Sequence, residues 1–441
     1  MHSDHASAPR RSTPPGLHSQ WLTADLPGVG GVLKQRPEDF LVDEQPQYEP
    51  AGAGEHIYLL VQKIGLTTSQ AVSILARHFG VRPSDVGYAG LKDKHAVTRQ
   101  VFSVHTPGKK PEDFPELRHE RVAVLWTDLH ANKLRPGHLK GNRFSIRIRG
   151  VDMSRAPAAK RILDRLAVSG VPNLAGEQRF GSRANNHTLG RLDLLGDEQA
   201  LLDELLGPDP AYPQNMPEAR EAYARSDYAS ALERCTPTAR TERAVLRALV
   251  RGADASRALR AVDDTQRRFW ITAFQSAIFN RVLSGRIDAG AFDRLLPGDL
   301  AQKRHNGALF AVDESLAADP STAERLRNFD ISPSGPLWGP RMMRAGGVID
   351  AIELAALEDT GVTLADMESF AQRSRQQISG ARRPFRAPVI DPEVEGGVDE
   401  HGHYIRCAFE LPAGAFATIV MREVMKSDAP DGGDDEPGPT E

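Results

Sequence analysis

The 441-residue sequence predicts an α+β fold, in which a largely helical segment is inserted into a domain built on a mixed sheet. Strand patterns occupy residues 55–149, helical patterns rich in Ala, Arg, Glu and Leu follow from about 180 to 383, and a strand pattern returns after 400. A chain of this length exceeds one ordinary domain. Because strands stand on both sides of the helical block, the two ends are expected to close a single domain.

The first elements carry clear local signals. Residues 55–62 contain the apolar run Ile57-Tyr58-Leu59-Leu60-Val61, which predicts a buried strand. Thr67 or Thr68 is expected to cap a helix that runs to Phe79 and ends at Gly80. Two further strands are predicted over residues 101–104 and 121–126.

Residues 144–149 alternate strictly between apolar and polar side chains. Phe144, Ile146 and Ile148 share one face, and Ser145, Arg147 and Arg149 share the other. The apolar face predicts a core. The arginine face suits either solvent or RNA phosphates, and the sequence does not choose between them.

The later elements follow the same reasoning. Alternation at Ile405, Cys407, Phe409 and Leu411 predicts a strand with Cys407 in the core, and residues 412–414 turn the chain into a helix that continues through Met425. Further helices are predicted over residues 157–168, 197–206, 218–235, 238–251, 267–283 and 364–373.

Composition excludes several protein classes. Two cysteines provide neither a disulfide framework nor a cysteine-rich zinc site, and no apolar run is long enough to span a membrane. The N-terminal residues lack the apolar segment of a signal peptide, so a cytoplasmic location is expected. His401-Gly402-His403 has no supporting ligands, which argues against a metal site.

The net charge of −4 depends on the C-terminal segment. Residues 427–441 carry six acidic side chains and no Lys or Arg, and without them the balance becomes +2. RNA binding depends on the local distribution of charge rather than on the total. The segment is rich in Gly, Pro and acids and is expected to be disordered.

The most informative stretch surrounds Asp93, which lies between Lys92 and Lys94 and is followed by His95. Neighbouring cations favour the ionised carboxylate, and ionised carboxylates act as nucleophiles or general bases. Taken alone, the same pattern is typical of a solvated surface loop.

The full string of residues 89–100, Ala-Gly-Leu-Lys-Asp-Lys-His-Ala-Val-Thr-Arg-Gln, resembles the active-site motif of the TruD family of tRNA pseudouridine synthases. The resemblance implies that Asp93 is the catalytic residue. Further blocks that resemble family motifs occur at residues 33–44, 134–144, 176–181, 269–280, 334–339 and 409–423.

These blocks imply further site residues. Phe40, Asn142, Phe144 and Phe409 match positions that contact the substrate in the family, and the possible supporting residues are Lys34, Lys92, His95 and Arg422. Purely structural roles remain alternatives for these residues. The three phenylalanines suit a core, Gly141-Asn142 suits a hairpin turn, and Lys34 and Arg422 suit a surface.

The chain also departs from the family pattern at two places. Leu174-Ala175 stands where the family commonly has an aromatic pair, and Ala415-Phe416 stands where it usually has Ser-Tyr. Any substrate contact from the first pair is therefore in doubt. The aromatic residues of 269–280 are expected to be core rather than RNA contacts.

The resemblance implies a domain plan and a function. The expected parts are an N-terminal disordered tail (1–27), a catalytic domain in two pieces (28–178 and 384–426) with a mixed, mainly antiparallel sheet, an inserted domain (179–383) and the acidic tail (427–441). The expected activity is isomerisation of uridine to pseudouridine, at position 13 of tRNA, by a monomer without cofactor or metal and without a membrane partner. A synthase of this family acting on another RNA, and a non-catalytic RNA-binding protein, remain alternatives.

Overall fold

The computed structural model describes residues 21–374 and 378–427, which divide into two compact units. The sheet unit comprises residues 21–173 and 386–427, and the helical unit comprises residues 174–374 and 378–385. The chain thus leaves the sheet unit after Asn173 and re-enters it at Arg386. The expected boundaries lay at 178 and 384.

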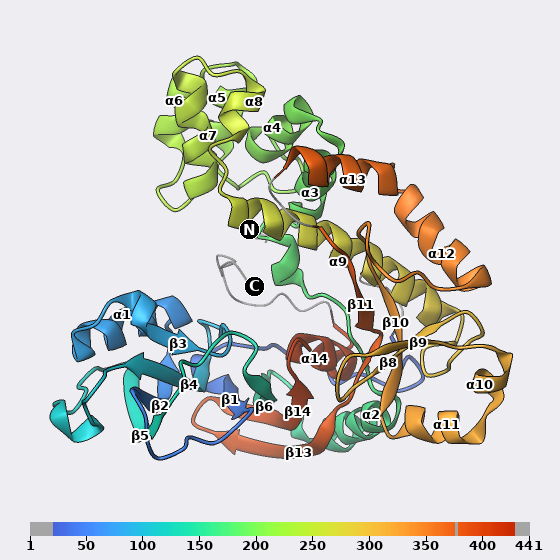
Figure 1. Ribbon diagram of the computed structural model, residues 1–441. Coiled ribbons are helices and arrows are strands. Elements are labelled where there is room, and N and C mark those ends of the chain that lie inside the picture. The colour runs from blue at the N-terminus through green and yellow to red at the C-terminus, as the bar shows by residue number, and fades with distance from the viewer. Residues whose placement is uncertain (1–20, 375–377, 428–441) are drawn as a thin grey trace, which may run out of the picture. The chain divides into compact units, whose positions relative to one another are not determined.

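The sheet unit is built on one mixed sheet, whose strands come from both ends of the chain (Figure 1). Its path is β13-β14-β6-β1-β4-β2-β5, with β3 added beside β4. In the described part of this sheet only β1 and β4 pair in parallel, which confirms the predicted mixed, mainly antiparallel sheet. The strands are β1 (Phe40–Pro46), β2 (His56–Ile64), β3 (Val86–Tyr88), β4 (Val97–His105), β5 (Val122–His130), β6 (Leu139–Arg149), β13 (Ile390–Asp399) and β14 (Gly402–Pro412).

The remaining elements of the sheet unit are short or helical. Strands β7 (Val171–Pro172) and β12 (Arg386–Ala387) pair with each other where the chain leaves and re-enters the unit. The α-helices are α1 (Thr68–Phe79), α2 (Ala156–Ser169) and α14 (Ala417–Met425), and short 3-10 helices lie at Pro37–Asp39, Pro83–Asp85, Pro111–Asp113 and Met153–Arg155.

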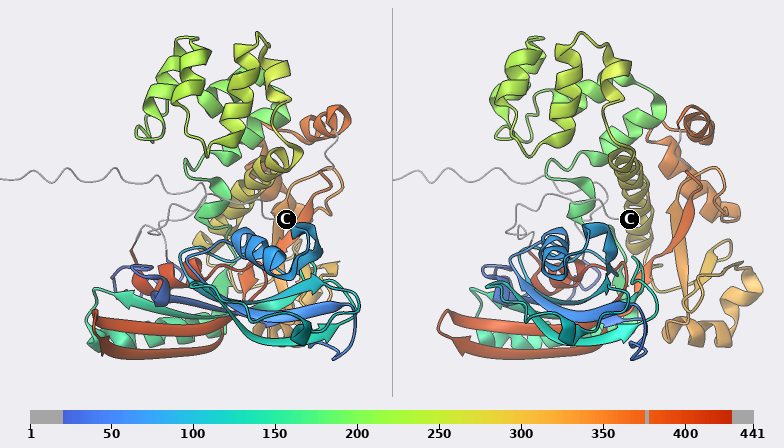
Figure 2. Two further views of the ribbon diagram at one scale, coloured as in Figure 1. Left: turned by 90° about the vertical axis from the view of Figure 1, so that its left-hand side faces the viewer. Right: turned by 60° about the vertical axis from the view of Figure 1, so that its left-hand side comes forward.

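Helix α1 covers one face of the β4-β2-β5 end of the sheet (Figure 2). Thr67 and Gln70 form a capping box at its start, and Gly80 ends it in the left-handed conformation with a φ of 66°. Its buried Ala71 and Leu75 belong to one core cluster with Ile57 and other apolar side chains of the strands. The predicted helix and its two ends are confirmed.

The arginines of β6 have a role that the alternation did not predict. Arg149 is buried and pairs with Asp39 and Asp399, each at 2.6 Å, and this guanidinium holds the pKa of Asp399 far below its usual range. Arg147 also bonds to Asp399 at 3.2 Å. Because Asp39 and Asp399 pair with the buried Arg149 guanidinium, Arg149 serves neither solvent nor RNA phosphates. Both arginines join segments that are distant in the sequence, while the Arg147 side chain stays partly exposed.

The helical unit contains most of the helices and a small four-stranded sheet, of order β11-β10-β8-β9, that the sequence reasoning did not single out. Its strands are β8 (Leu300–Lys303), β9 (Leu309–Ala311), β10 (Ile331–Leu337) and β11 (Ala381–Pro384). Its helices are α3 (Asn186–Leu195), α4 (Glu198–Leu206), α5 (Pro217–Ala224), α6 (Tyr228–Arg234), α7 (Arg240–Val250), α8 (Ala255–Leu259), α9 (Asp264–Asp288), α10 (Glu314–Ala318), α11 (Pro320–Arg327), α12 (Gly347–Glu358) and α13 (Leu364–Arg373), with a 3-10 turn at Glu177–Phe180.

The prediction of one helix over residues 218–235 is wrong. The segment forms α5 and α6, which are separated at Ser226, where the backbone has a φ of 60°. Asp227 then accepts a hydrogen bond from the backbone N–H of Ser230 and starts α6 as its N-cap. A left-handed residue followed by a cap interrupts the helical hydrogen-bond ladder, although the apolar period continues through it.

The aromatic residues of α9 are core, as expected. Phe269, Trp270, Phe274 and Phe279 are all buried.

The expected N-terminal tail is too long by several residues. Thr23 is buried, and its backbone N–H and hydroxyl group both donate to the carboxylate of Glu423 in α14. Residues 21–27 are therefore attached to the sheet unit rather than disordered. Residues 1–20 and 428–441, where the rest of the two expected tails falls, lie outside the described residues.

Candidate active site

Asp93 lies in the loop between β3 and β4, and its carboxylate contacts Lys34 and the backbone of His95. Lys34 Nζ is 2.6 Å from Asp93 Oδ2, and the backbone N–H of His95 donates to Asp93 Oδ1 at 3.0 Å. The Lys34 side chain is only 2% exposed, whereas that of Asp93 is 14% exposed. The lysine is thus withdrawn from solvent while the carboxylate keeps some accessible surface.

Hydrogen bonds with Lys63 and Thr68 hold the backbone of the Asp93 loop. Lys63 is fully buried and donates to the carbonyl oxygens of Asp93 at 2.9 Å and Leu66 at 2.6 Å. The Thr68 hydroxyl oxygen accepts from the backbone N–H of Lys92 at 2.9 Å. These bonds fix the loop backbone before any ligand arrives, as a preorganised site requires.

A second charged pair fixes Asn142. Glu44 of β1 and Asn142 of β6 lie directly opposite each other in the sheet register. Lys92 Nζ reaches between them, 2.7 Å from Glu44 Oε2 and 2.8 Å from Asn142 Oδ1. Because the amide oxygen of Asn142 is engaged by Lys92, its NH₂ group is the end left to act as a donor.

The site also contains one aromatic cluster, which is formed by Phe40, Phe144 and Phe409. The ring centroids of Phe40 and Phe144 are 6.3 Å apart and those of Phe144 and Phe409 are 5.8 Å apart. Lys34 Nζ lies 4.9 Å from the Phe40 centroid, which joins the cluster to Asp93. All three rings are buried, and Phe409 exposes none of its surface.

Most of the chain is similar to proteins of one family. A model of "tRNA pseudouridine synthase D (TruD)" matches residues 17–424. Proteins named tRNA pseudouridine synthase D from Geotalea daltonii and Geobacter metallireducens are each 42% identical, over 92% and 93% of this chain and 99% of each relative. This chain belongs to the TruD family.

A solved structure supports the same assignment. A candidate tRNA pseudouridine synthase D (TruD) from Methanosarcina mazei superposes with a TM-score of 0.77, at 28% identity, over 93% of this chain and 96% of its own. The TruD-family fold expected from the sequence is therefore confirmed.

In this TruD-family chain, most of the residues expected at the site come together. The contacts described above link the Asp93 loop, which includes Lys92 and His95, to Lys34, Asn142 and the aromatic residues. Arg422 of α14 places its guanidinium over the Trp21 ring, 4.5 Å from the centroid. The expected role of Arg422 at a carboxylate or phosphate stays a prediction.

Sequence reasoning missed three residues of this TruD-family site: Glu44, Lys63 and Thr68. A weak signal existed for Lys63, which is a lysine near the end of a strand that begins with an apolar run. Glu44 carried no such signal, because only the register of β1 against β6 shows that it faces Asn142.

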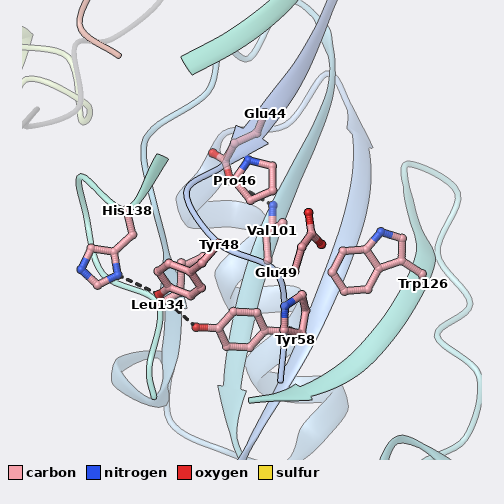
Figure 3. A pocket seen from close by; sticks show the side chains of 10 residues that line it. Glu44, Pro46, Tyr48, Glu49, Tyr58, Val101, Trp126, Leu134 and His138 are labelled. Atoms are coloured by element: carbon pink, nitrogen blue, oxygen red, sulfur yellow. Dashed lines mark hydrogen bonds between the residues drawn. The ribbon is translucent and has the colours of Figure 1, made fainter. Parts of the chain in front are cut away.

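A pocket that Glu44 helps to line opens on the same sheet (Figure 3). Its lining includes Glu44, Tyr48, Glu49, Tyr58, Trp126 and His138. Glu44 therefore belongs both to the pocket wall and to the ion pair with Lys92, the residue before Asp93.

Among the described residues there is neither a candidate metal cluster nor a helix that could span a membrane. The described residues contain no group of three or more His, Cys, Asp or Glu side chains that could hold a metal ion. None of their helices is long and apolar enough to cross a membrane.

Proposed function

We propose that this protein is a tRNA pseudouridine synthase, an isomerase that converts uridine in tRNA to pseudouridine with Asp93 as its catalytic carboxylate. The observation that carries the proposal is the Asp93 side chain itself, which is paired with the buried Lys34 at 2.6 Å and still partly exposed. Family membership over nearly the whole chain supports the reaction.

The reaction needs few groups. The bond between N1 of uracil and C1′ of ribose breaks, the base turns, and C5 bonds to C1′ while the C5 proton is lost and N1 gains one. Asp93 either attacks C1′ or removes a neighbouring ribose proton, and both roles use the ionised carboxylate. In both, Lys34 and the His95 backbone N–H hold the carboxylate in one orientation.

The surrounding residues are assigned by their contacts. Asn142, held by Lys92, offers its NH₂ group to the carbonyl oxygens or ribose of the target. Phe40 and Phe144 meet the uracil ring once it has left its stack. Phe409, predicted to touch the substrate, supports Phe144 from within the core, because it has no exposed surface.

The finer parts of the proposal rest on the family resemblance alone. They are position 13 as the target, tRNA as the partner, a monomeric state, a cytoplasmic location and a reaction without cofactor or metal.

The test uses unmodified tRNA transcripts incubated with wild-type protein and with Asp93→Asn. Carbodiimide treatment and primer extension then map pseudouridine. We expect primer extension to stop at one uridine after incubation with wild type. Asp93→Asn should give no stop, because loss of a nucleophile or base usually lowers the rate by about 10²–10⁴-fold. The affinity of Asp93→Asn for tRNA should be unchanged.

Asp43→Asn serves as the matched control, because Asp43 is a partly exposed carboxylate of β1 whose ion pair with Arg99 spans 3.5 Å. It should keep wild-type activity. Activity of Asp93→Asn within about tenfold of wild type would contradict the assignment. Tight tRNA binding without any stop would favour a non-catalytic RNA-binding protein or another RNA substrate.

A further inference from the structure

The pocket beside Glu44 is lined by aromatic rings and lies on the face of the sheet opposite α1. Tyr58, Leu60 and Val101 belong to a second buried cluster, separate from the one that contains Ile57, Leu59 and Val61 under α1. Since side chains alternate along a strand, Tyr58 and Leu60 of β2 point away from α1. The pocket is therefore built on the face that α1 leaves uncovered.

A β-bulge places Trp126 in this pocket. Val61 pairs with Val124, but Leu60 pairs with Trp126, so Leu125 is an extra residue in β5. In a regular strand Val122, Val124 and Trp126 would share the α1 face, where Val122 and Val124 do pack. The extra residue turns Trp126 to the other face, beside Tyr58 and Val101.

The polar groups of the pocket are arranged around these rings (Figure 3). Tyr58 donates to the Asn132 carbonyl oxygen at 2.9 Å, and Tyr48 Oη lies 3.4 Å from Tyr58 Oη and 2.9 Å from His138 Nδ1. Glu49 lines the pocket together with Trp126, and among the described residues its carboxylate has no hydrogen-bond or ion-pair partner. Trp126 remains 36% exposed.

We propose that a second unstacked RNA base, distinct from the target uridine, stacks on the exposed Trp126 ring at the mouth of this pocket, and that Glu49 accepts hydrogen bonds from its amino group. Aromatic walls hold a base by stacking. A carboxylate accepts from amino groups on a base edge but repels phosphates, so the pocket suits a base rather than the RNA backbone. The inference rests on the proposed function for its choice of RNA as the ligand.

Glu44 connects the pocket with the active site, although the two lie on different faces of the sheet: Lys63 and Thr68, which hold the Asp93 loop, lie on the α1 side, and the pocket lies on the other. Glu44 lines the pocket and pairs with Lys92, which precedes Asp93. The loop that carries Leu134 and His138 also carries the exposed cation Arg135, which suits a phosphate on either side of the bound base. Occupation of the pocket would thus add affinity for RNA at a place outside the active site.

The test measures dissociation constants and, separately, pseudouridine formation on the same tRNA transcripts. Each unpaired nucleotide of the transcript other than the target is replaced in turn by an abasic one. With wild type, we expect one position besides the target to weaken binding by about 5- to 150-fold, the range that stacking of one base provides. Trp126→Ala should show the same loss on intact RNA and almost no further loss at that position.

Three further variants sharpen the comparison. Trp126→Phe should keep most of the affinity, and Val398→Ala, an exposed apolar side chain on β13 at the other end of the sheet, should behave as wild type. Glu49→Ala should weaken binding of the RNA with the amino-bearing base and not of RNA whose base at that position lacks the amino group. If the Glu49 carboxylate only repelled phosphates, its removal would instead tighten binding to both RNAs.

The pocket and the proposed function fail in different ways. Unchanged affinity in Trp126→Ala, or additive losses at every abasic position, would overturn the pocket assignment even if pseudouridine forms. Binding with the expected abasic pattern but no pseudouridine would overturn the proposed isomerase and leave the pocket standing.

Discussion

Lys34 combines an unusual backbone with the main charge of the site. Its φ of 53° lies in the left-handed region, which side chains other than glycine rarely adopt, and its ammonium group is 2.6 Å from Asp93. Strain of this kind persists where surrounding structure enforces it, and functional sites are where it gathers. The conformation is consistent with selection for the ion pair rather than for stability.

Replacement of Lys34 tests this role. Lys34→Met should lower turnover by about 10²-fold, because it removes the charge that holds the carboxylate, while tRNA affinity changes little. It should also lower the free energy of unfolding by about 1–3 kcal/mol, less than for a fully buried pair, since Asp93 is partly exposed. Single-turnover kinetics and urea titration measure the two effects, and Lys34→Arg should recover part of the activity.

His187 of α3 makes the stability of the helical unit depend on pH. Burial lowers the pKa of His187 to about 4 from its usual 6.5. Between these values the unfolded chain binds a proton that the folded chain does not, so stability is complete above pH 6.5 and falls as the pH drops toward 4. The loss reaches about 3 kcal/mol at most.

Urea midpoints measured by circular dichroism between pH 4 and 7 check this expectation. His187→Gln should flatten the dependence, whereas His305→Gln, at an exposed position of the same unit, should keep it. A wild-type midpoint that is constant across this range would contradict the prediction.

At the scale of elements, α3 and α9 are in close contact through a glycine. A Cβ atom at Gly190 of α3 would lie 2.1 Å from the carbonyl oxygen of Trp270 in α9, and a backbone atom cannot move aside without shifting the helix. By contrast, a Cβ atom at Gly285 of α9 would meet nothing within 4 Å. Helix packing therefore requires a glycine at position 190 but not at position 285.

The same substitution should have opposite effects at these positions. Gly190→Ala should destabilise the protein by about 1–3 kcal/mol through overpacking, and Gly285→Ala should stabilise it by about 0.5–1 kcal/mol through helix propensity. Thermal and urea unfolding measure both. Equal effects would show that the contact between α3 and α9 does not decide the choice of glycine.

At the scale of the whole molecule, charge is unevenly distributed along the chain. Deletion of residues 428–441 removes six acidic side chains and changes the formal net charge from −4 to +2. The shortened protein should bind tRNA a few-fold more tightly at about 0.05 M salt, with a smaller difference at about 0.3 M because salt screens exposed charges.

Filter-binding titrations over this salt range test the effect. A variant with the segment replaced by Gly and Ser residues of the same length separates charge from length. Equal affinity of all three proteins at low salt would show that the acidic segment does not weaken RNA binding.

The sequence by itself determined the features that depend on neighbouring residues. Local signals predicted the caps of α1, the bounds Leu364–Arg373 of α13, the buried face of β14 and the motif around Asp93, because each signal lies within a few residues of the chain. Periodicity also gave the order of sheet, helical block and sheet.

Only the tertiary structure decided which distant groups meet. The link from Glu44 through Lys92 to Asn142 depends on the register of β1 against β6, and the ion pairs of Arg149 depend on Asp39 and Asp399, far away in the chain. The turn of Trp126 toward its pocket depends on one extra residue in β5. A hydrophobic period states which face of an element is buried, but register and bulges choose the partners, because they are set by the pairing of strands from different parts of the chain.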